Sequence, residues 1–333
     1  MSQYRPWGLL DWVLSHCSTR HDWALLGSLS TDERSLSAWR SLRSRGQLAS
    51  VKLLKIANKP SRYDLAIQQR ERDRIAEFKA EGGDDKDIEP HYLLEPVSDI
   101  VDTINGFLGA CGPNVVLDVS VLPKRFFFPM LKILFKEAGT VPNLIVTYTS
   151  PEGYTSEKLS ENQDDWDHIP LFSGSYTSAK PKMMVINVGF EGAGLQEQVD
   201  QGEAGLPIKL LFPFPAPPSA FARSWELVRR LQKNRLPDAF RIYQADSREV
   251  SDAFDRLLTL TDKGNHRIVL APFGPKPISV AMCIFATLTE SPVFYSQPKV
   301  YHPYYSYGVA QVGGAAAVWA HCIRLDGNDY YEL

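Results

Sequence analysis

The chain has 333 residues and a formal net charge of −3, and 44% of its residues are hydrophobic while 23% are charged. This composition is ordinary for a soluble globular protein. The slight acidic balance argues against a general nucleic-acid binder, which would carry a basic surplus, but it is compatible with a small anionic ligand held by a few cations. The length predicts two domains or one large sheet.

The four cysteines, Cys17, Cys111, Cys283 and Cys322, lie far apart, with no CxxC pair and no histidine at ligand spacing. We therefore expect neither a zinc site nor a disulfide framework, and we expect no cofactor. No apolar run approaches the length of about 18 residues that predicts a membrane span. Together these patterns predict a soluble, cytoplasmic protein that does not contact a membrane.

Strands alternate with helices in the first half of the chain. The strands are predicted at residues 23–29, 49–56, 91–95, 115–117 and 143–148. The helices are predicted at residues 31–46, 68–79, 98–108 and from 126 onward. This alternation is typical of a parallel, Rossmann-like sheet. The second of these helices interleaves arginines with acids, which predicts a solvent-facing helix with i,i+4 ion pairs; nucleic-acid binding by its arginines is the alternative.

Residues 150–180 break the alternation with Gly, Ser, Tyr and acidic residues, which predicts a connecting segment with a hairpin on the rim. The alternation then restarts, with strands predicted at residues 182–189, 207–212, 240–243, 268–270 and 293–298. Similar stretches recur in the same order in both halves, as in Val115–Leu117 and Ile268–Leu270. We therefore predict an α/β fold with two Rossmann-like parallel-sheet units in tandem, residues 1–175 and 176–333, related by pseudo-twofold symmetry.

The most informative stretch follows the fourth predicted strand, where Asp118, Ser120, Lys124 and Arg125 precede an apolar helix. Ligands bind at the carboxyl ends of strands in open α/β sheets, and backbone N–H groups at a helix start suit a phosphate. The alternative is that Ser120 caps the helix and the two cations are solvated. A Pro-Lys pair that ends at Lys276 precedes another apolar helix in the second half, which favours the ligand interpretation.

Other strand ends add small or polar residues to this candidate site. The predicted ligand-binding set is Ser28, Thr31, Asp118, Ser120, Lys124, Arg125, Gly189, Gly274 and Lys276. The run Gly189-x-x-Gly192-x-Gly194 departs from the GxGxxG spacing of dinucleotide sites, and Glu191 would repel a phosphate. A tight turn is therefore the alternative to an NAD site there.

The spacing Asp118-x-Ser120-x-x-x-Lys124 resembles the signature that follows the fourth strand in the CRISPR-associated Rossmann fold (CARF) family. The second-half loop departs from this pattern, since Ala271 and Phe273 replace the Asp and the Ser while Lys276 remains. Members of that family, and the SAVED domains that look like two such units fused, sense cyclic oligonucleotides in antiviral defence. The resemblance implies a nucleotide-sensing protein of a prokaryotic antiviral defence system, with a pocket between its halves and an effector or complex partner protein.

Two other functions stay open. Some members of the family are ring nucleases, which need no metal because a ribose 2′-hydroxyl attacks the neighbouring phosphate. Such chemistry depends mainly on alignment and charge stabilisation.

The second alternative is a scaffold subunit that has lost its ligand. The altered second loop and the aromatic stretch Tyr301–Tyr307 favour it, although that stretch is also compatible with a rim hairpin. No GxSxG, HExxH or P-loop motif supports conventional hydrolase or kinase chemistry, and no catalytic residue is assigned.

Overall fold

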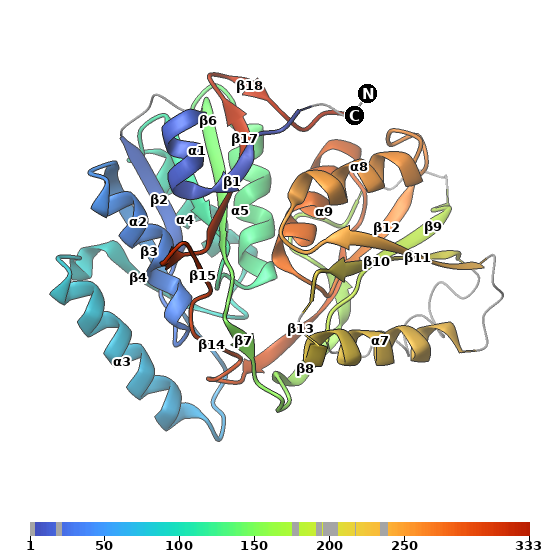
Figure 1. The fold of residues 1–333 in the computed structure, drawn as a ribbon, viewed down its shortest axis with the longest axis horizontal. Helices are drawn as coiled ribbons and strands as arrows, with labels where there is room; N and C mark the ends of the chain where they lie inside the picture. The colour runs from blue at the N-terminus through green and yellow to red at the C-terminus, as the bar shows by residue number, and fades with distance from the viewer. Residues whose placement is uncertain are drawn as a thin grey trace. The chain divides into compact units, whose positions relative to one another are not determined.

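The computed structural model describes residues 4–17, 22–174, 180–190, 195, 206–216, 218–233 and 239–333. The chain forms two compact α/β units (Figure 1). The first unit comprises Gln3–Asn162 and Lys299–Tyr330, and the second comprises Gln163–Pro298 and Tyr331–Leu333.

The sheet of the first unit contains five parallel strands in the spatial order β4-β3-β2-β5-β6. In that order they span Ile88–Tyr92, Leu48–Ala57, Trp23–Ser28, Asn114–Asp118 and Asn143–Thr149. The order along the sheet therefore reverses between β2 and β5, as in doubly wound Rossmann folds. The parallel, Rossmann-like sheet predicted from the sequence is confirmed.

Antiparallel strands extend this sheet beyond β6. The strand β17 (Val318–Leu325) pairs with β6, and β1 (Trp7–Leu9) and the short β18 (Asn328–Asp329) both pair with β17. Because β17 forms main-chain hydrogen bonds with β6, the stretch Lys299–Tyr330 belongs to the first unit. The predicted second unit, residues 176–333, is corrected accordingly: the contiguous part of the observed second unit ends at Pro298.

A buried arginine fixes β17 to the helix that follows β5. This helix, α5, spans Lys124–Lys136, and Arg324 of β17 is fully buried beside its C-terminal end. The guanidinium donates hydrogen bonds to the main-chain oxygens of Phe135 at 2.5 Å and Val141 at 3.0 Å, and it pairs with Asp329 at 2.6 Å. Carbonyl groups at the end of a helix lack intrahelical partners, so these contacts satisfy groups that would otherwise be buried without a donor.

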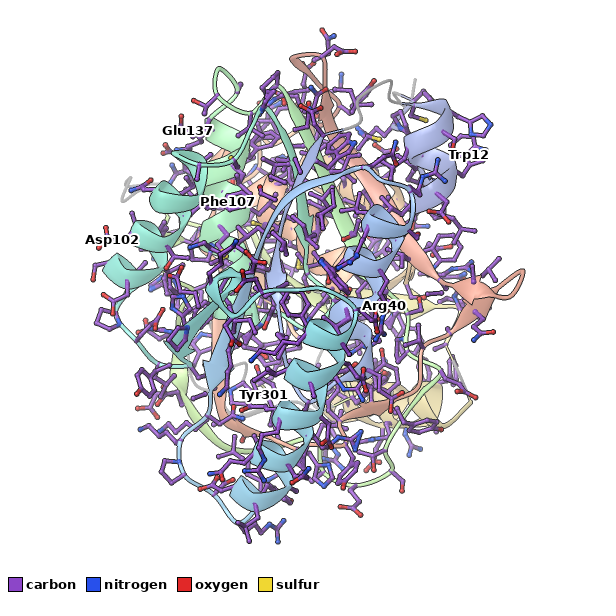
Figure 2. All side chains as sticks on the ribbon, turned by 90° about the vertical axis from the view of Figure 1, so that its left-hand side faces the viewer. Trp12, Arg40, Asp102, Phe107, Glu137 and Tyr301 are labelled. Carbon is purple, nitrogen blue, oxygen red and sulfur yellow. The ribbon has the colours of Figure 1, made fainter. Side chains whose placement is uncertain are left out.

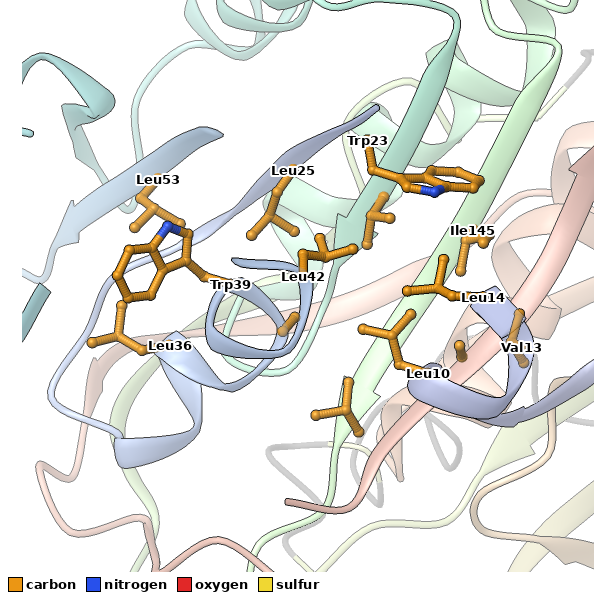
Figure 3. Close-up of a cluster of buried hydrophobic side chains, with 14 of the residues drawn as sticks. Leu10, Val13, Leu14, Trp23, Leu25, Leu36, Trp39, Leu42, Leu53 and Ile145 are labelled. Carbon is orange, nitrogen blue, oxygen red and sulfur yellow. The ribbon is translucent and has the colours of Figure 1, made fainter. Parts of the chain in front are cut away.

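One face of the first sheet is covered by helices from the N-terminal part of the chain. These helices are α1 (Leu10–His16), η1 (Glu33–Leu36), α2 (Ser37–Ser44) and α3 (Asp64–Ala80). Figure 3 shows leucines of α1, η1 and α2 packed with Trp23 and Trp39 against the sheet, and the Trp39 ring lies 4.8 Å from that of Phe78 on α3. Two buried tryptophans provide much of the apolar area that stabilises this layer.

The helix α3 contains an internal ion pair, at i,i+3 spacing where the sequence predicted i,i+4 pairs. Arg74 pairs with Glu77 at 2.6 Å, and Arg40 of α2 contacts both Glu77 and Glu81 beside one end of α3 (Figure 2). These side chains are partly exposed, so each pair contributes only about 0–1 kcal/mol to stability. The remaining helices of the first unit are the short η2 (Asp85–Asp87) and α4 (Val97–Leu108), and α4 packs against α5.

The second unit repeats the order of parallel strands found in the first. Its sheet has the order β11-β10-β9-β12, with bounds Phe240–Asp246, Ile208–Phe214, Met183–Asn187 and Ile268–Pro272. Its helices are α7 (Pro218–Gln232), α8 (Val250–Leu260) and α9 (Lys276–Thr289). The strand order reverses between β9 and β12, and Val293 adds a parallel bridge to Leu270. The predicted duplication and its pseudo-twofold axis stay predictions, and the predicted helix at residues 195–200 lies, apart from Leu195, outside the described residues.

The predicted rim hairpin within residues 150–180 is wrong. The strand β7 (Gly153–Tyr154) pairs with β14 (Ser306–Tyr307), and β8 (Ser160–His168) pairs with β13 (Phe294–Tyr301). Each segment therefore finds its partner more than 100 residues along the chain. The short strands β15 (Gln311–Val312) and β16 (Ala315–Ala316) pair with each other.

Within the described ranges, none of the helices has both the length and the apolar character that crossing a membrane requires.

His321 on β17 should make the stability of the protein sensitive to acid. Its ring is 1% exposed and stacks on Trp7 at 5.8 Å, and neither ring nitrogen has a hydrogen-bond partner. Burial lowers the pKa of His321 from 6.5 to about 3. Between these two pH values the unfolded chain binds a proton that the folded chain does not, so stability falls as the pH is lowered.

We expect the free energy of unfolding to fall by about 3 kcal/mol through His321 alone between about pH 6.5 and 4, as measured by urea denaturation. The variant His321→Phe should lose this part of the pH dependence, whereas His16→Gln at an exposed position should retain it. An unchanged pH profile in His321→Phe would contradict the assignment.

Candidate functional site

The sequence-predicted residues of the first unit gather where its strand order reverses. Ser28 ends β2, Asp118 ends the adjacent β5, and the two strands pair in parallel through Leu26 and Leu117. In open α/β sheets the loops that leave two such strands diverge to opposite faces and leave a crevice at the carboxyl edge. We refer to the carboxyl edge of β2 and β5, with the loops that follow them, as the switch-point site.

A buried hydrogen-bond network shapes the loop after β5. Asp118 Oδ1 accepts hydrogen bonds from Ser120 Oγ at 2.5 Å and from Thr147 Oγ1 at 3.1 Å, and Ser120 Oγ accepts one from the Thr149 N–H at 2.8 Å. All four residues are buried. Ser120 therefore joins the end of β5 to the end of β6, and its hydroxyl does not cap α5. The alternative role as a helix cap is thus wrong, because α5 begins only at Lys124, after Pro123.

Lys124, the first residue of α5, is 9% exposed although its side chain ends in an ammonium group. Burial lowers the pKa of Lys124 from 10.5 to about 7, because a low-dielectric environment disfavours the charged form. The expectation of a solvated cation is therefore wrong for this residue. A desolvated lysine at the carboxyl end of a strand interacts strongly with any anion that reaches it, since little water screens the attraction.

Arg125 is held by the turn that follows β4. Its guanidinium donates to the main-chain oxygen of Glu95 at 2.8 Å. The Glu95 carboxylate lies 2.7 Å from His91 Nδ1, and His91 Nε2 lies 3.1 Å from Glu89 Oε1. Glu89 also accepts a hydrogen bond from Thr103 of α4 at 2.8 Å. This cluster connects the start of α5 to β4 and α4, so Arg125 has a structural contact where the sequence predicted a ligand contact.

The residues predicted after β2 make internal contacts as well. Ser28 is buried and donates to the main-chain oxygen of Leu54 at 2.7 Å, whereas Thr31 is half-buried and its main-chain oxygen lies 3.4 Å from Arg70 Nε. The polar groups that dominate this loop are Asp32 and Arg34, which the sequence prediction did not include. The only signal for them was the helix-start composition of residues 30–33, which pointed to a cap.

Asp32 and Arg34 form a bidentate buried ion pair at the switch-point site. Arg34 Nη2 lies 2.8 Å from Asp32 Oδ2, and the guanidinium also donates to the main-chain oxygen of Thr149 at 3.1 Å and to Ser306 Oγ at 3.0 Å. Burial opposes ionisation of Asp32, but the charge and hydrogen bonds of Arg34 lower its pKa below the usual range. The pair links the loop after β2 to β6 and to β14, and so closes part of the edge with the chain's own groups.

In the second unit, backbone contacts occupy the corresponding crevice. A Cβ atom at Gly189 would lie 2.2 Å from the Phe273 oxygen, and one at Gly274 would lie 2.3 Å from the Val188 oxygen. The Phe273 N–H also donates to the Asn187 oxygen at 3.0 Å, so the loops after β9 and β12 are in direct contact. Lys276 begins α9, as predicted. Gly189 and Gly274 thus allow two loops to approach closely, while Gly192 and Gly194 lie outside the described residues.

The described residues contain no group of three or more His, Cys, Asp or Glu side chains placed to hold a metal ion. The switch-point site contributes the buried amine of Lys124, the hydroxyl of Ser120 and the ion pair of Asp32 with Arg34. Cationic and hydroxyl groups of this kind can hold and orient an anion.

Adding a methyl group at Gly274 should destabilise the second unit. Gly274→Ala would place its Cβ within 2.3 Å of backbone, and forced repacking of this kind costs about 1–3 kcal/mol. Gly106→Ala, in the interior of α4, meets nothing within 4 Å and should instead stabilise the protein by about 0.5–1 kcal/mol. Urea denaturation of both variants measures the difference; equal stabilities would show that the two loops are not in contact.

Comparisons with known proteins leave the family of the chain open. No protein-family model matches the sequence, and no curated protein does. Among solved structures, the chain is similar to a functionally unknown protein from Pseudomonas aeruginosa PAO1, with 14% identity, 83% of this chain and 92% of the other covered, and a TM-score of 0.24. It is also similar to the cytoplasmic domain of a prokaryotic cation chloride cotransporter, with 11% identity, coverages of 84% and 96%, and a TM-score of 0.23. Likenesses this remote carry no argument about fold or function.

Proposed function

We propose that this protein is a nucleotide sensor of a prokaryotic antiviral defence system, which binds a small nucleotide or cyclic oligonucleotide at the switch-point site of its first unit. The single observation that carries the proposal is the buried ammonium of Lys124, at the start of α5 and directly after the loop that Asp118 and Ser120 hold in place. Burying a lysine disfavours its charged form, and an arriving phosphate would restore the charge in place. The resemblance of this loop to the CARF signature supports a nucleotide as the source of the phosphate.

The proposal gives the loop residues different roles. Asp118 and Ser120 are buried and bonded to each other and to β6, so they hold the loop in shape. Lys124 supplies the charge that meets the phosphate. Because the loops of the second unit touch at Gly189 and Gly274, the ligand is held asymmetrically by the first unit. The expected pocket between the two halves stays a prediction.

Removing the charge of Lys124 should weaken ligand binding without weakening the fold. In calorimetric titrations with a panel of cyclic and linear oligonucleotides, Lys124→Met should lower the affinity for the bound member about ten- to hundred-fold, because a charge-assisted hydrogen bond is lost. The variant should be at least as stable as the native protein, since methionine is buried more readily than an ammonium. Lys136→Met, at the exposed end of the same helix, is the matched control and should bind normally.

The pH dependence of the affinity separates this role from a general loss of structure. The phosphodiesters of a cyclic ligand carry no titratable proton near neutral pH, so only the protein changes charge. As the pH rises through about 7, Lys124 of the free protein loses its proton and the affinity should fall by up to tenfold per pH unit. Lys124→Arg should flatten this profile. Unchanged affinity in Lys124→Met for every member of the panel would refute the proposal.

A second candidate function, a scaffold subunit of a defence complex, is favoured by exposed aromatic side chains on α7. Phe221 and Trp225 are each 41% exposed, and their rings stack 6.3 Å apart. Exposed Trp and Phe side chains are frequent at the centres of protein interfaces. Native mass spectrometry of protein purified from its host should then find one partner chain at fixed stoichiometry, lost in Phe221→Ser/Trp225→Ser. Retention of a nucleotide without any partner chain would favour the sensor.

A further inference from the structure

An aromatic cluster lies on the first unit, beside the loop that follows β2. It consists of Tyr63, His302 and Tyr304, with Arg62 and Arg70 against its outer rings, and we call it the rim cluster. The Tyr63 and His302 rings are 4.9 Å apart, and the His302 and Tyr304 rings are 5.9 Å apart. Arg62 lies 4.8 Å from the centre of the Tyr63 ring, and Arg70 lies 4.4 Å from that of Tyr304. Three rings and two cations thus form one connected surface.

The rim cluster is rigid because its central histidine is held on both sides. The Tyr304 N–H donates to His302 Nδ1 at 3.1 Å, and His302 Nε2 lies 3.0 Å from Glu157 Oε2. Since Nδ1 accepts a hydrogen bond, the proton of the ring sits on Nε2 and points to the carboxylate. The main chain of His302 also donates to the Leu159 oxygen at 3.0 Å. The backbone that carries Tyr304 is therefore fixed before any ligand arrives.

Tyr304 is contacted by Arg70 and is partly exposed to solvent. The Arg70 guanidinium covers part of the ring, and the side chain of Arg70 is itself anchored by the Thr31 oxygen at 3.4 Å and by Glu33 at 3.7 Å. The tyrosine nevertheless remains 48% exposed. A partly exposed aromatic ring that also contacts a cation is a platform on which a planar base can stack.

Hydrogen bonds connect the rim cluster to the switch-point site. Ser306, two residues beyond Tyr304, accepts a hydrogen bond from Arg34, and Arg34 donates to the Thr149 oxygen. Thr149 in turn donates to Ser120. Thr31, whose oxygen anchors Arg70, belongs to the loop after β2. A chain of buried hydrogen bonds therefore runs from the segment that carries Tyr304 to the loop that precedes Lys124, at the carboxyl edge of the first sheet.

We infer that the exposed face of Tyr304 stacks the base of the nucleotide, while Lys124 meets a phosphate. This inference rests on the proposed function and adds how the base is recognised. Stacking distinguishes poorly among bases because every base has a flat aromatic face. Through Tyr304 the site therefore binds nucleotides more tightly than phosphate compounds that lack a base, with little preference for one base.

Two ligands with the same phosphate test the inference, namely adenosine 5′-monophosphate and ribose 5-phosphate, which lacks the base. The native protein should bind the nucleotide about ten- to hundred-fold more tightly than the sugar phosphate, in the range that one base–aromatic stack supplies. Tyr304→Ala should remove this difference and leave the affinity for ribose 5-phosphate unchanged. Tyr304→Phe retains the ring and should retain the difference.

The control is Tyr4→Ala, which should change neither affinity. Tyr4 is exposed and precedes β1, which runs parallel to β6, so it lies at the opposite, amino edge of the sheet. Lys124→Met should lower the affinity for both ligands by the same factor. Equal affinity of the native protein for the two ligands, with binding still lost in Lys124→Met, would overturn the stacking inference and leave the phosphate site standing. Failure of both ligands to bind the native protein would overturn both.

Discussion

The pairing of β17 with β6 is the constraint on which the first unit depends. Without β17, the main-chain groups at one edge of β6 and the main-chain oxygens of Phe135 and Val141 would lose the partners they have in β17 and Arg324. Unpaired buried backbone groups are costly, so the sheet is complete only when the last part of the chain has returned to it. The same return brings Ser306 to Arg34 and Tyr304 to Arg70. The polar surface at the carboxyl edge is thus assembled from both ends of the chain.

At that edge, structural and ligand-binding roles are separated by how the hydrogen-bonding groups are used. Ser120 has its hydroxyl engaged by Asp118 and by Thr149, and Asp32 is engaged by Arg34. These groups stabilise the fold, because removing any one of them would leave its hydrogen-bond partner buried and unsatisfied. Lys124 differs, since burial lowers its pKa and so disfavours its charged form, whereas Arg34 outweighs the effect of burial on Asp32. A group whose charged form is disfavoured in the free protein is one that an anion can stabilise on binding.

Local patterns predicted the parallel strands well, because each combines a short apolar run with a turn that ends it. The bounds of β5 and β6 agree with prediction within about two residues, the usual uncertainty of such assignments. The strand predicted at 91–95 lies at Ile88–Tyr92. Pro90 argued against a strand that begins before it, and Glu95 belongs to the following turn. The pairing of β7 with β14 was unpredictable from local sequence, because two-residue strands carry no periodicity and their partners are set by the tertiary fold.

The candidate site was predicted in part for the same reason. The spacing of Asp118, Ser120 and Lys124 placed all three in one loop, but only the three-dimensional arrangement shows that Ser120 bonds to Thr149 on a different strand. Burial is likewise a property of the assembled fold, so the sequence predicted a solvated cation at position 124 as readily as a desolvated one. No sequence motif indicates the ion pair of Asp32 with Arg34. Its place in the site depends on the hydrogen bond from Arg34 to Ser306, more than 250 residues away.

The division of the first unit between the two ends of the chain has a consequence for biosynthesis. The second unit is contiguous over Gln163–Pro298, so all of its central strands leave the ribosome before Lys299 does. Domains tend to fold as they emerge, which allows the second unit to fold first although it lies later in the sequence. The first unit must meanwhile keep the edge of β6 unpaired until β17 emerges. An exposed strand edge of this kind is prone to wrong pairing, so this interval is the most vulnerable stage in the maturation of the protein.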